Sequence, residues 1–221
     1  MKALTDRVAA RRRGALVQAL RIKGVVDERV LDAIDRVPRH AFVPDTSLLG
    51  QAYDDVALPI GLGQTISQPY TVARMTELLG VREGDRVLEV GTGSGYQAAV
   101  LAALGARVFS VERHEPILQR TVEILDRLGV RVRTKAGDGT LGWPAYAPFD
   151  RVIVTAGGPA VPPALVGQLR EPDPPRPDAR LVIPVGPPKH QVLHRITRTA
   201  DGTTDETFEG VVFVPLVSGE G

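Results

Sequence analysis

Apolar side chains recur at helical spacing in the first 45 residues of the chain. One group lies along the first segment and comprises Val8, Leu16, Val17 and Leu20. A second group follows Asp27, a residue type that caps helix N-termini, and stops at Pro38, which cannot continue a helix. The pattern therefore predicts an N-terminal helical extension.

Residues 46–68 show neither a helical nor an alternating pattern. One proline and two glycines interrupt the middle of this stretch, so it is predicted to be irregular. Helical spacing returns at residues 69–79, with proline at the first position and glycine directly after the last. We therefore expect a loop region that leads into a well-bounded helix.

From residue 84 onward, short apolar segments alternate with helical ones. Strands are predicted at 84–91, 106–112, 131–139, 149–158 and 180–186. Helices are predicted at 96–105, from 116 to 129, and at 162–169. Apolar strands joined through helices are typical of a parallel sheet covered on both faces. The fold class is therefore α/β, with a doubly wound, mostly parallel sheet.

After residue 169 the alternation of strands and helices ends. Residues 170–179 contain four prolines and are predicted to be an irregular loop. Two strand-like segments, 191–199 and 206–216, flank an Asp201-Gly202 pair, which is a hairpin signal. We therefore expect a C-terminal β-hairpin.

Composition narrows the organisation and the possible partners. A chain of 221 residues favours a single domain, 1–221, in which 1–68 form an extension and 69–221 the core. The net charge of +1 argues against a nucleic-acid partner. No apolar run reaches the length of about 18 residues that a membrane helix needs, and no apolar leader segment begins the chain. We expect no membrane partner and a cytoplasmic location.

The absence of cysteine and the scatter of the histidines limit the chemistry. Without cysteine the chain can form no disulfide, thiolate metal site or cysteine nucleophile. The four histidines lie far apart, except for His190 and His194, which a strand start separates. No metal site is expected.

The strongest local signal is the sequence VLEVGTGSGY at 87–96. A buried strand ends there in a run of small residues before a helix: Gly91, Thr92, Gly93, Ser94 and Gly95. Glycines let the backbone turn tightly and approach a ligand closely, although a tight turn without a ligand would use them too. An acidic residue, Glu89, precedes the turn, and this order is typical of S-adenosylmethionine-dependent methyltransferases of the Rossmann-like type.

A nicotinamide-dependent dehydrogenase is the competing enzyme class. Its fingerprint is G-x-G-x-x-G, whereas here the third glycine comes one residue early and Tyr96 occupies the sixth position. No histidine near a strand end suggests itself as a hydride partner. The spacing therefore favours the methyltransferase.

Two further acids follow strands of the same predicted sheet. Glu112 ends the second strand, where a βαβ unit presents a carboxylate to ribose hydroxyls. Asp138, between two glycines, follows the third strand and suits the adenine edge of a ligand. The alternatives are a surface glutamate that caps the next helix and a plain Asp-Gly turn.

Several blocks of the chain closely resemble the protein-L-isoaspartate O-methyltransferase family. They are VPRHAFVP at 37–44, GQTISQP at 63–69, the glycine-rich turn, GDG at 137–139, FDRVIVTAGG at 149–158 and LVIPVG at 181–186. GQTISQP is the specific block, because many methyltransferases share the turn alone. The family usually reaches its fifth strand through a short Gly-Gly turn, whereas here the link is the longer EPDPPRPDA.

The resemblance implies transfer of a methyl group from S-adenosylmethionine to the free carboxylate of L-isoaspartyl residues in damaged proteins and peptides. It implies that Ser67 is catalytic and that Ile66 contacts the substrate through its backbone; taken alone, Ser67 would be a helix cap. The segment 214–217 is a weaker substrate candidate. The implied cofactor-binding residues are Glu89, Gly91, Thr92, Gly93, Ser94, Gly95, Glu112, Arg113, Asp138 and Gly139. Methylation of another carboxylate and a non-catalytic isoaspartyl-binding adaptor remain the alternatives.

Overall fold

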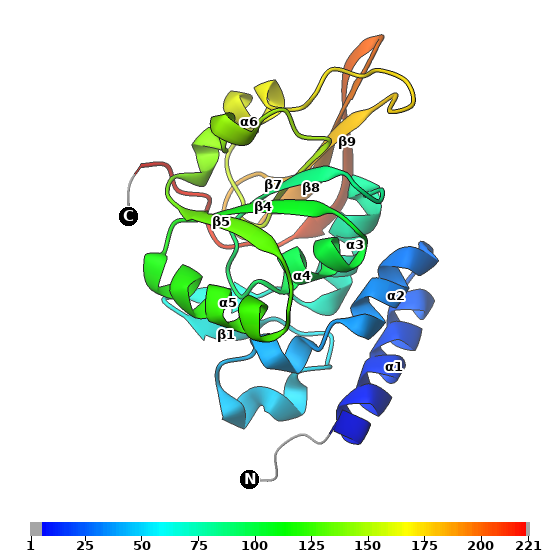
Figure 1. Ribbon diagram of the computed structural model, residues 1–221, viewed down its shortest axis with the longest axis vertical. Helices are drawn as coiled ribbons and strands as arrows, with labels where there is room; N and C mark the ends of the chain where they lie inside the picture. The colour runs from blue at the N-terminus through cyan, green and yellow to red at the C-terminus, as the bar shows by residue number, and fades with distance from the viewer. Residues whose placement is uncertain (1–5, 220–221) are drawn as a thin grey trace.

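A computed structural model describes residues 6–219 of the chain (Figure 1). The first five residues of the expected extension, and residues 220 and 221, lie outside the described part. The helices are α1 (Asp6–Ile22), α2 (Glu28–Arg36), α3 (Pro69–Leu79), α4 (Tyr96–Ala103), α5 (Glu115–Arg127) and α6 (Pro163–Gly167). Short 3-10 helices are η1 (Arg39–Phe42), η2 (Thr46–Gln51), η3 (Gly139–Leu141) and η4 (Pro144–Tyr146). The strands are β1 (Leu58–Gly61), β2 (Gln64–Ile66), β3 (Arg86–Val90), β4 (Arg107–Glu112), β5 (Val132–Ala136), β6 (Arg151–Val154), β7 (Ala179–Val185), β8 (Gln191–Thr199) and β9 (Gly202–Val211).

The main sheet has seven strands in the order β5-β4-β3-β6-β7-β8-β9. The first five are parallel, and β8 and β9 add antiparallel neighbours at one edge. From β3 the chain builds outward through β4 to β5, then crosses back to β6 on the other side of β3. Ligands of doubly wound sheets bind beyond the carboxyl ends of the strands at such a crossing. The predicted fold class and the C-terminal hairpin are confirmed.

Both faces of the sheet are covered, as the apolar strands predicted. Val87 of β3 packs with α3 and α4 on one face. Its neighbours Leu88 and Val90 point to the opposite face, where they pack with Phe149 and with Leu165 of α6. This alternation matters for the site, because Glu89 shares the face of Val87.

The N-terminal helices lie outside α3 and α4 (Figure 1). Asp27 caps α2, and its side chain accepts a hydrogen bond from the N–H of Arg29 as that residue type predicted. The buried face of α2 carries Val30, Leu31 and Ile34, which join the core beneath α4. The extension therefore adds a third layer on this side of the sheet.

The prediction that residues 46–68 are irregular is wrong. The stretch contains η2 and a two-stranded antiparallel hairpin of β1 and β2, with Leu58 paired to Ile66. Leu58 and Ile60 are buried and alternate with exposed neighbours, but the strands have only four and three residues. Gly61 and Gly63 do not break the structure. Their φ angles of +98° and +70° form the turn of the hairpin.

The strand predicted at 206–216 ends early in the structure. β9 begins at Gly202, and its last residue is Val211. Beyond it the chain leaves the sheet edge and pairs with Gly157, whose N–H donates to Val214 O and whose carbonyl accepts from Leu216 N. The C-terminal segment is therefore brought to the carboxyl end of β6, next to the crossing point.

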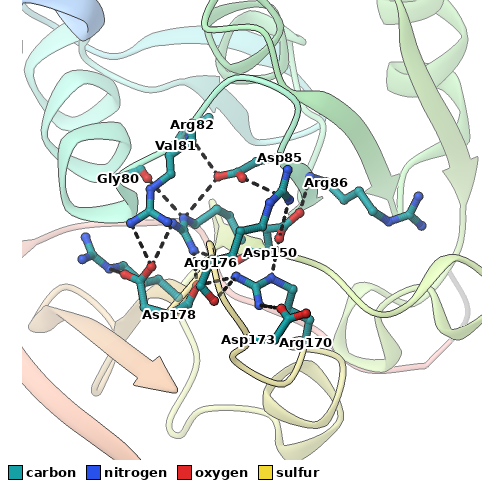
Figure 2. A network of polar contacts seen from close by, with 12 residues as sticks. Gly80, Val81, Arg82, Asp85, Arg86, Asp150, Arg170, Asp173, Arg176 and Asp178 are labelled. Atoms are coloured by element: carbon teal, nitrogen blue, oxygen red, sulfur yellow. Dashed lines mark hydrogen bonds and ion pairs between the residues drawn. The ribbon is translucent and has the colours of Figure 1, made fainter. Parts of the chain in front are cut away.

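An aspartate precedes each of three neighbouring strands at the opposite, amino end of the sheet. Asp85, Asp150 and Asp178 stand before β3, β6 and β7, and Figure 2 shows the arginines that gather around them. Arg151 is buried among them and lies 3.5 Å from Asp85 and 3.3 Å from Asp178. Arg176 reaches Asp150 at 2.7 Å, so this network anchors the proline-rich loop to the sheet.

Candidate active site

A pocket opens at the carboxyl ends of the parallel strands, where the chain crosses from β3 to β6. Four segments that are distant in sequence line it: the turn after β3, the residues after β4, those after β6 and the C-terminal segment beyond β9. The β1–β2 hairpin supplies a fifth wall through residues 64–67. The pocket therefore brings the glycine-rich turn and the TIS segment together.

The glycine-rich turn is held too tightly for other residue types. Gly91 has φ +93°, and a Cβ there would lie 2.5 Å from the hydroxyl oxygen of Thr155. At Gly95, with φ +85°, a Cβ would lie 2.6 Å from Thr121 Cγ2. The Thr155 hydroxyl donates to Gly91 O at 2.6 Å and so ties the turn to the end of β6. The turn is thus a rigid backbone wall of the pocket.

Glu112 is buried at the end of β4 and lines the pocket. Its Oε2 accepts from Gly93 N at 2.8 Å, and its Oε1 accepts from His114 N at 2.9 Å. The alternative of a surface glutamate is wrong, whereas the idea that it supports the next helix is partly right, because His114 is the N-cap of α5. The carboxylate keeps lone pairs for further donors, such as hydroxyls.

Glu89 lies behind the turn and does not line the pocket. Its Oε2 accepts a hydrogen bond from Ser110 Oγ at 2.5 Å, and Ser110 Oγ lies 2.6 Å from Thr92 Oγ1. Its other oxygen has no hydrogen-bond partner among residues 6–219. Burial raises the pKa of Glu89 to about 8; the Ser110 bond opposes this and the nearby Glu112 adds to it. Glu89 therefore reaches the pocket only through Ser110 and Thr92.

Arg113 and Asp138 both hold the C-terminal segment. Arg113 lines the pocket, and its guanidinium donates to the carbonyls of residues 217–219. One carboxylate oxygen of Asp138 accepts a hydrogen bond from Gly219 N at 2.6 Å, and the other accepts one from Thr140 N at 2.8 Å. Asp138 is the N-cap of η3, which agrees with the alternative of a plain Asp-Gly turn. Gly139 lines the pocket, whereas Asp138 does not.

Ser67 follows β2 and faces the pocket. The alternative that it caps α3 is wrong, since the N-cap is Gln68 and the N–H of Tyr70 donates instead to Asp55 Oδ1 at 2.7 Å. No residue from 6 to 219 forms a hydrogen bond with the Ser67 hydroxyl. Ile66 has a buried side chain, so it offers the pocket mainly backbone atoms. Ser67 is therefore positioned by the backbone and free to bind through its hydroxyl.

A second cleft adjoins the first at Ser67. The two share Thr65, Ser67, Thr155, Phe213 and Val214. Beyond this junction the second cleft runs between α3 and the β8–β9 hairpin, towards charged side chains at its rim: Arg74, Lys189 and Glu209. One pocket is thus lined by the glycine-rich turn, the other by α3 and the β8–β9 hairpin, and Ser67 lines both.

Comparison with known proteins decides which methyltransferases this site resembles. The family model described as protein-L-isoaspartate(D-aspartate) O-methyltransferase matches residues 11–221. The chain belongs to this family. It is 55% identical to the protein-L-isoaspartate O-methyltransferase of Salinibacter ruber over 96% of this chain and 94% of the relative. The one from Methylorubrum extorquens is 52% identical over 98% and 92%. A solved protein-L-isoaspartate O-methyltransferase superposes with a TM-score of 0.82 at 28% identity, covering 94% of this chain and 66% of the solved one.

Sequence reasoning missed several residues of this family member's pocket. Thr155 and Ala156 follow β6 directly, so the end of the fourth predicted strand was a usable signal for them. Phe213 lines the pocket because the chain leaves the sheet after Val211, the last residue of β9. The segment 214–217, a weak substrate candidate from the sequence, lines the pocket. Within residues 6–219 no group of three or more metal-ligating side chains gathers, and no helix is long and apolar enough to cross a membrane.

Proposed function

We propose that the two clefts divide the reaction of the family between them, with S-adenosylmethionine in the first and the polypeptide in the second. The chain transfers a methyl group from this cofactor to the free carboxylate of L-isoaspartyl residues in damaged proteins and peptides, which initiates their repair. One observation carries the assignment of the clefts. The Ser67 hydroxyl, without a partner in the described chain, lies where they meet.

The first cleft suits a cationic ligand that carries hydroxyl groups. Glu112 lines this cleft and Glu89 is buried behind its glycine-rich turn, and neither forms an ion pair within residues 6–219. Buried carboxylates without a counter-charge favour a positive ligand. S-adenosylmethionine supplies an electrophilic methyl group on a positively charged sulfur.

Each predicted cofactor-binding residue has a place in this proposal. Glu112 accepts from the ribose hydroxyls, and the backbone from Gly91 to Gly95, with Thr92 and Ser94, cradles the amino-acid end. Glu89 acts on that end through Thr92. Gly139 borders the adenine side, where Arg113 and Asp138 act by holding the C-terminal segment.

Ser67 and Ile66 serve the substrate. An isoaspartyl carboxylate is already ionised at neutral pH, so the reaction needs no general base. The protein must exclude water and align the attacking oxygen with the methyl group, and positioning of this kind can supply much of the rate. The Ser67 hydroxyl donates to the carboxylate, while the backbone of Ile66 contacts the peptide. Backbone recognition suits damaged sites, which share no flanking side chains.

This division of labour treats residues 1–221 as one domain. The extension, 1–68, supplies the substrate-side segment, and 69–221 form the cofactor-binding core. Isoaspartyl proteins and peptides are then the partners, with no nucleic acid, membrane or obligate protein partner. The cytoplasm remains our prediction for where the chain acts, and a protein without cysteine is compatible with that reducing compartment.

The test is methyl transfer to paired peptides that differ only in Asp versus isoaspartate. We expect the isoaspartyl peptide to be methylated and the aspartyl peptide to stay unmodified. Equal methylation of both would support a methyltransferase with another carboxylate substrate. Tight binding of the isoaspartyl peptide without turnover would support an adaptor, and binding of NAD in place of S-adenosylmethionine would support the dehydrogenase.

A further inference from the structure

Arg39 is fully buried beside the active-site segment, at the start of η1. Its guanidinium donates to three backbone carbonyls of the chain between η1 and α3. Nη1 reaches Ala52 O at 2.5 Å, and Nη2 reaches Val56 O at 3.0 Å and Ser67 O at 3.1 Å. A single side chain therefore gathers both ends of the loop and hairpin that precede Ser67.

The positive charge of Arg39 is buried in the protein. No ion pair of Arg39 exists within residues 6–219, and burial lowers its pKa, an effect that Tyr96 and Asp55 oppose. A buried cation that contacts carbonyl dipoles and has no carboxylate at ion-pair distance costs more than a neutral side chain of similar size. The buried arginine therefore points to a role that depends on the planar geometry of its guanidinium.

The guanidinium also lies close to an aromatic residue of the first pocket. Its central carbon lies 5.8 Å from the ring centroid of Tyr96, within reach of a cation–π interaction. Tyr96 directly follows Gly95 and lines the same pocket as Ser67. Phe42, three residues after Arg39, packs edge-on against this ring at 5.7 Å. Arg39 thus contacts both the substrate-side segment and the residue that ends the glycine-rich turn.

We propose that Arg39 is a positioning residue for methyl transfer, which sets the distance between Ser67 and the glycine-rich turn by binding the Ser67 carbonyl and the Tyr96 ring together. The proposal rests on the proposed function of the two clefts. Arginine suits this task because its planar fork presents five donors in fixed directions. A lysine ammonium is a single point with three donors on a flexible stem, so it cannot hold these carbonyls in the same arrangement.

The chain offers a matched control at the far end of the sheet. Arg151 is equally buried and also donates to three backbone carbonyls, those of Gly80, Asp150 and Asp178. It lies at the amino ends of the strands, away from both clefts. Unlike Arg39, it also forms ion pairs with Asp85 and Asp178. Replacing Arg151 by lysine therefore removes a similar set of guanidinium-to-carbonyl bonds without touching the pocket.

The experiment compares Arg39→Lys with Arg151→Lys in the full chain. Four quantities are measured for each: kcat on an isoaspartyl peptide, the Kd of S-adenosylmethionine by calorimetry, the melting temperature, and amide hydrogen exchange. We expect Arg39→Lys to lower kcat about tenfold or more, as expected for lost alignment, with an unchanged Kd. Exchange should speed up in residues 52–68 and stay unchanged in β3 and β4. Arg151→Lys should lower the melting temperature and leave kcat at the wild-type value.

Equal losses of kcat in both variants, or an unchanged kcat in Arg39→Lys, would overturn the proposal. If Arg39→Lys folds too poorly for kinetics, Arg39→Gln replaces it, since it keeps two N–H donors without a buried charge. Failure of both variants to fold would also overturn it, because Arg39 would then determine the whole fold. An inactive wild-type chain would instead count against the proposed function, so the two failures are distinguishable.

Discussion

The two ends of the central strands carry buried acids in opposite electrostatic settings. At the amino end, Asp85, Asp150 and Asp178 are each in contact with at least one arginine (Figure 2). At the carboxyl end, Glu89 and Glu112 have only hydroxyl and N–H partners in the described chain. The strand β3 carries one acid of each set, Asp85 directly before it and Glu89 near its carboxyl end. The difference therefore comes from which loops bring arginines to each end.

The pKa values follow this difference. Burial raises the pKa of Asp150, but Arg176 and Arg170 outweigh it and hold the value below the usual range. At Glu89 no group of opposite charge within residues 6–219 opposes burial, and the pKa rises to about 8. The comparison teaches that the chain neutralises its own acids where they support the fold. At the carboxyl end, where we propose that the cofactor binds, it leaves Glu89 and Glu112 without a counter-charge from the described chain.

The largest effect is expected from Asp150→Asn at the amino end. This change removes the buried counter-charge of Arg170 and the nearer of the two carboxylates that face Arg176, which keeps Asp85 at 3.5 Å. Breaking a buried ion pair by removing one partner costs about 3–5 kcal/mol of unfolding free energy. Turnover of the folded variant should equal that of the wild type. Denaturant unfolding measures the first quantity and steady-state kinetics the second. Asp173→Asn is the control, since Asp173 is exposed and its ion pair with Arg170 should contribute little.

The pH dependence of the same variant sharpens this result. Because the folded-state pKa of Asp150 is lowered, its stabilisation is present above the unfolded pKa of about 3.9 and is lost as pH falls through the folded value. The wild type should therefore lose its advantage over Asp150→Asn in strongly acidic solution. A constant difference in stability down to that range would contradict the ion-pair explanation.

At the carboxyl end, Ser67→Ala should have the next largest effect. Losing one oriented donor in an active site lowers turnover by roughly one to three orders of magnitude. The Kd of S-adenosylmethionine and the melting temperature should stay unchanged, since the hydroxyl has no partner within the described chain. A variant with wild-type turnover would remove the catalytic assignment of Ser67.

The sequence predicted most of the elements and many of the residues that line the first cleft. Apolar periodicity located the five parallel strands, and the glycine-rich run located the turn, because both signals are local. The β1–β2 hairpin was missed since its strands are too short for alternation to show. The two glycines in its turn resembled breaks in structure.

Long-range contacts account for what the sequence could not predict in the site. Thr155 matters because its hydroxyl reaches the carbonyl of Gly91, 64 positions earlier. Arg39 matters because it reaches Ser67, 28 positions later. The partners of Arg113 and Asp138 depend on where the C-terminal segment runs, and no local pattern shows that its path crosses to β6. Residue type alone therefore found Arg113 and Asp138 without finding what they bind, and it did not find Thr155 or Arg39.

Glu112→Ala tests the acid that lines the first cleft. Hydrogen bonds to a charged group contribute about 1.5–3 kcal/mol, so the Kd of S-adenosylmethionine should rise about tenfold or more. Glu112→Gln keeps the shape and one acceptor oxygen, and it should fall between the alanine variant and the wild type. Glu115→Ala, on the exposed first turn of α5, is the control. Equal affinities in all four proteins by calorimetry would leave Glu112 as a support for Gly93 and His114 alone.

Glu89→Gln should have the smallest effect, and one that depends on pH. With its pKa at about 8, Glu89 is mostly protonated in the free protein at neutral pH. A cation bound nearby favours the ionised form, so the affinity of the wild type for S-adenosylmethionine should rise with pH through the neutral range, by at most about tenfold per unit. The affinity of Glu89→Gln should not change with pH over this range. Binding to the wild type should also release protons, which calorimetry in buffers of different ionisation enthalpy detects.

The pH dependence of the stability of the wild type and of Glu89→Gln tests the raised pKa of Glu89 independently. A folded-state pKa raised above the usual value of about 4.3 means that the folded wild type binds more protons than the unfolded chain between that value and about 8. Its stability should therefore fall across this range as pH rises, while that of Glu89→Gln changes less. The wild type and Glu89→Gln could instead show the same pH dependence of affinity and of stability. The charge of Glu89 would then be neutralised within the protein as fully as the charges of the aspartates at the amino end. The contrast between the two ends of the sheet would then rest on Glu112 alone.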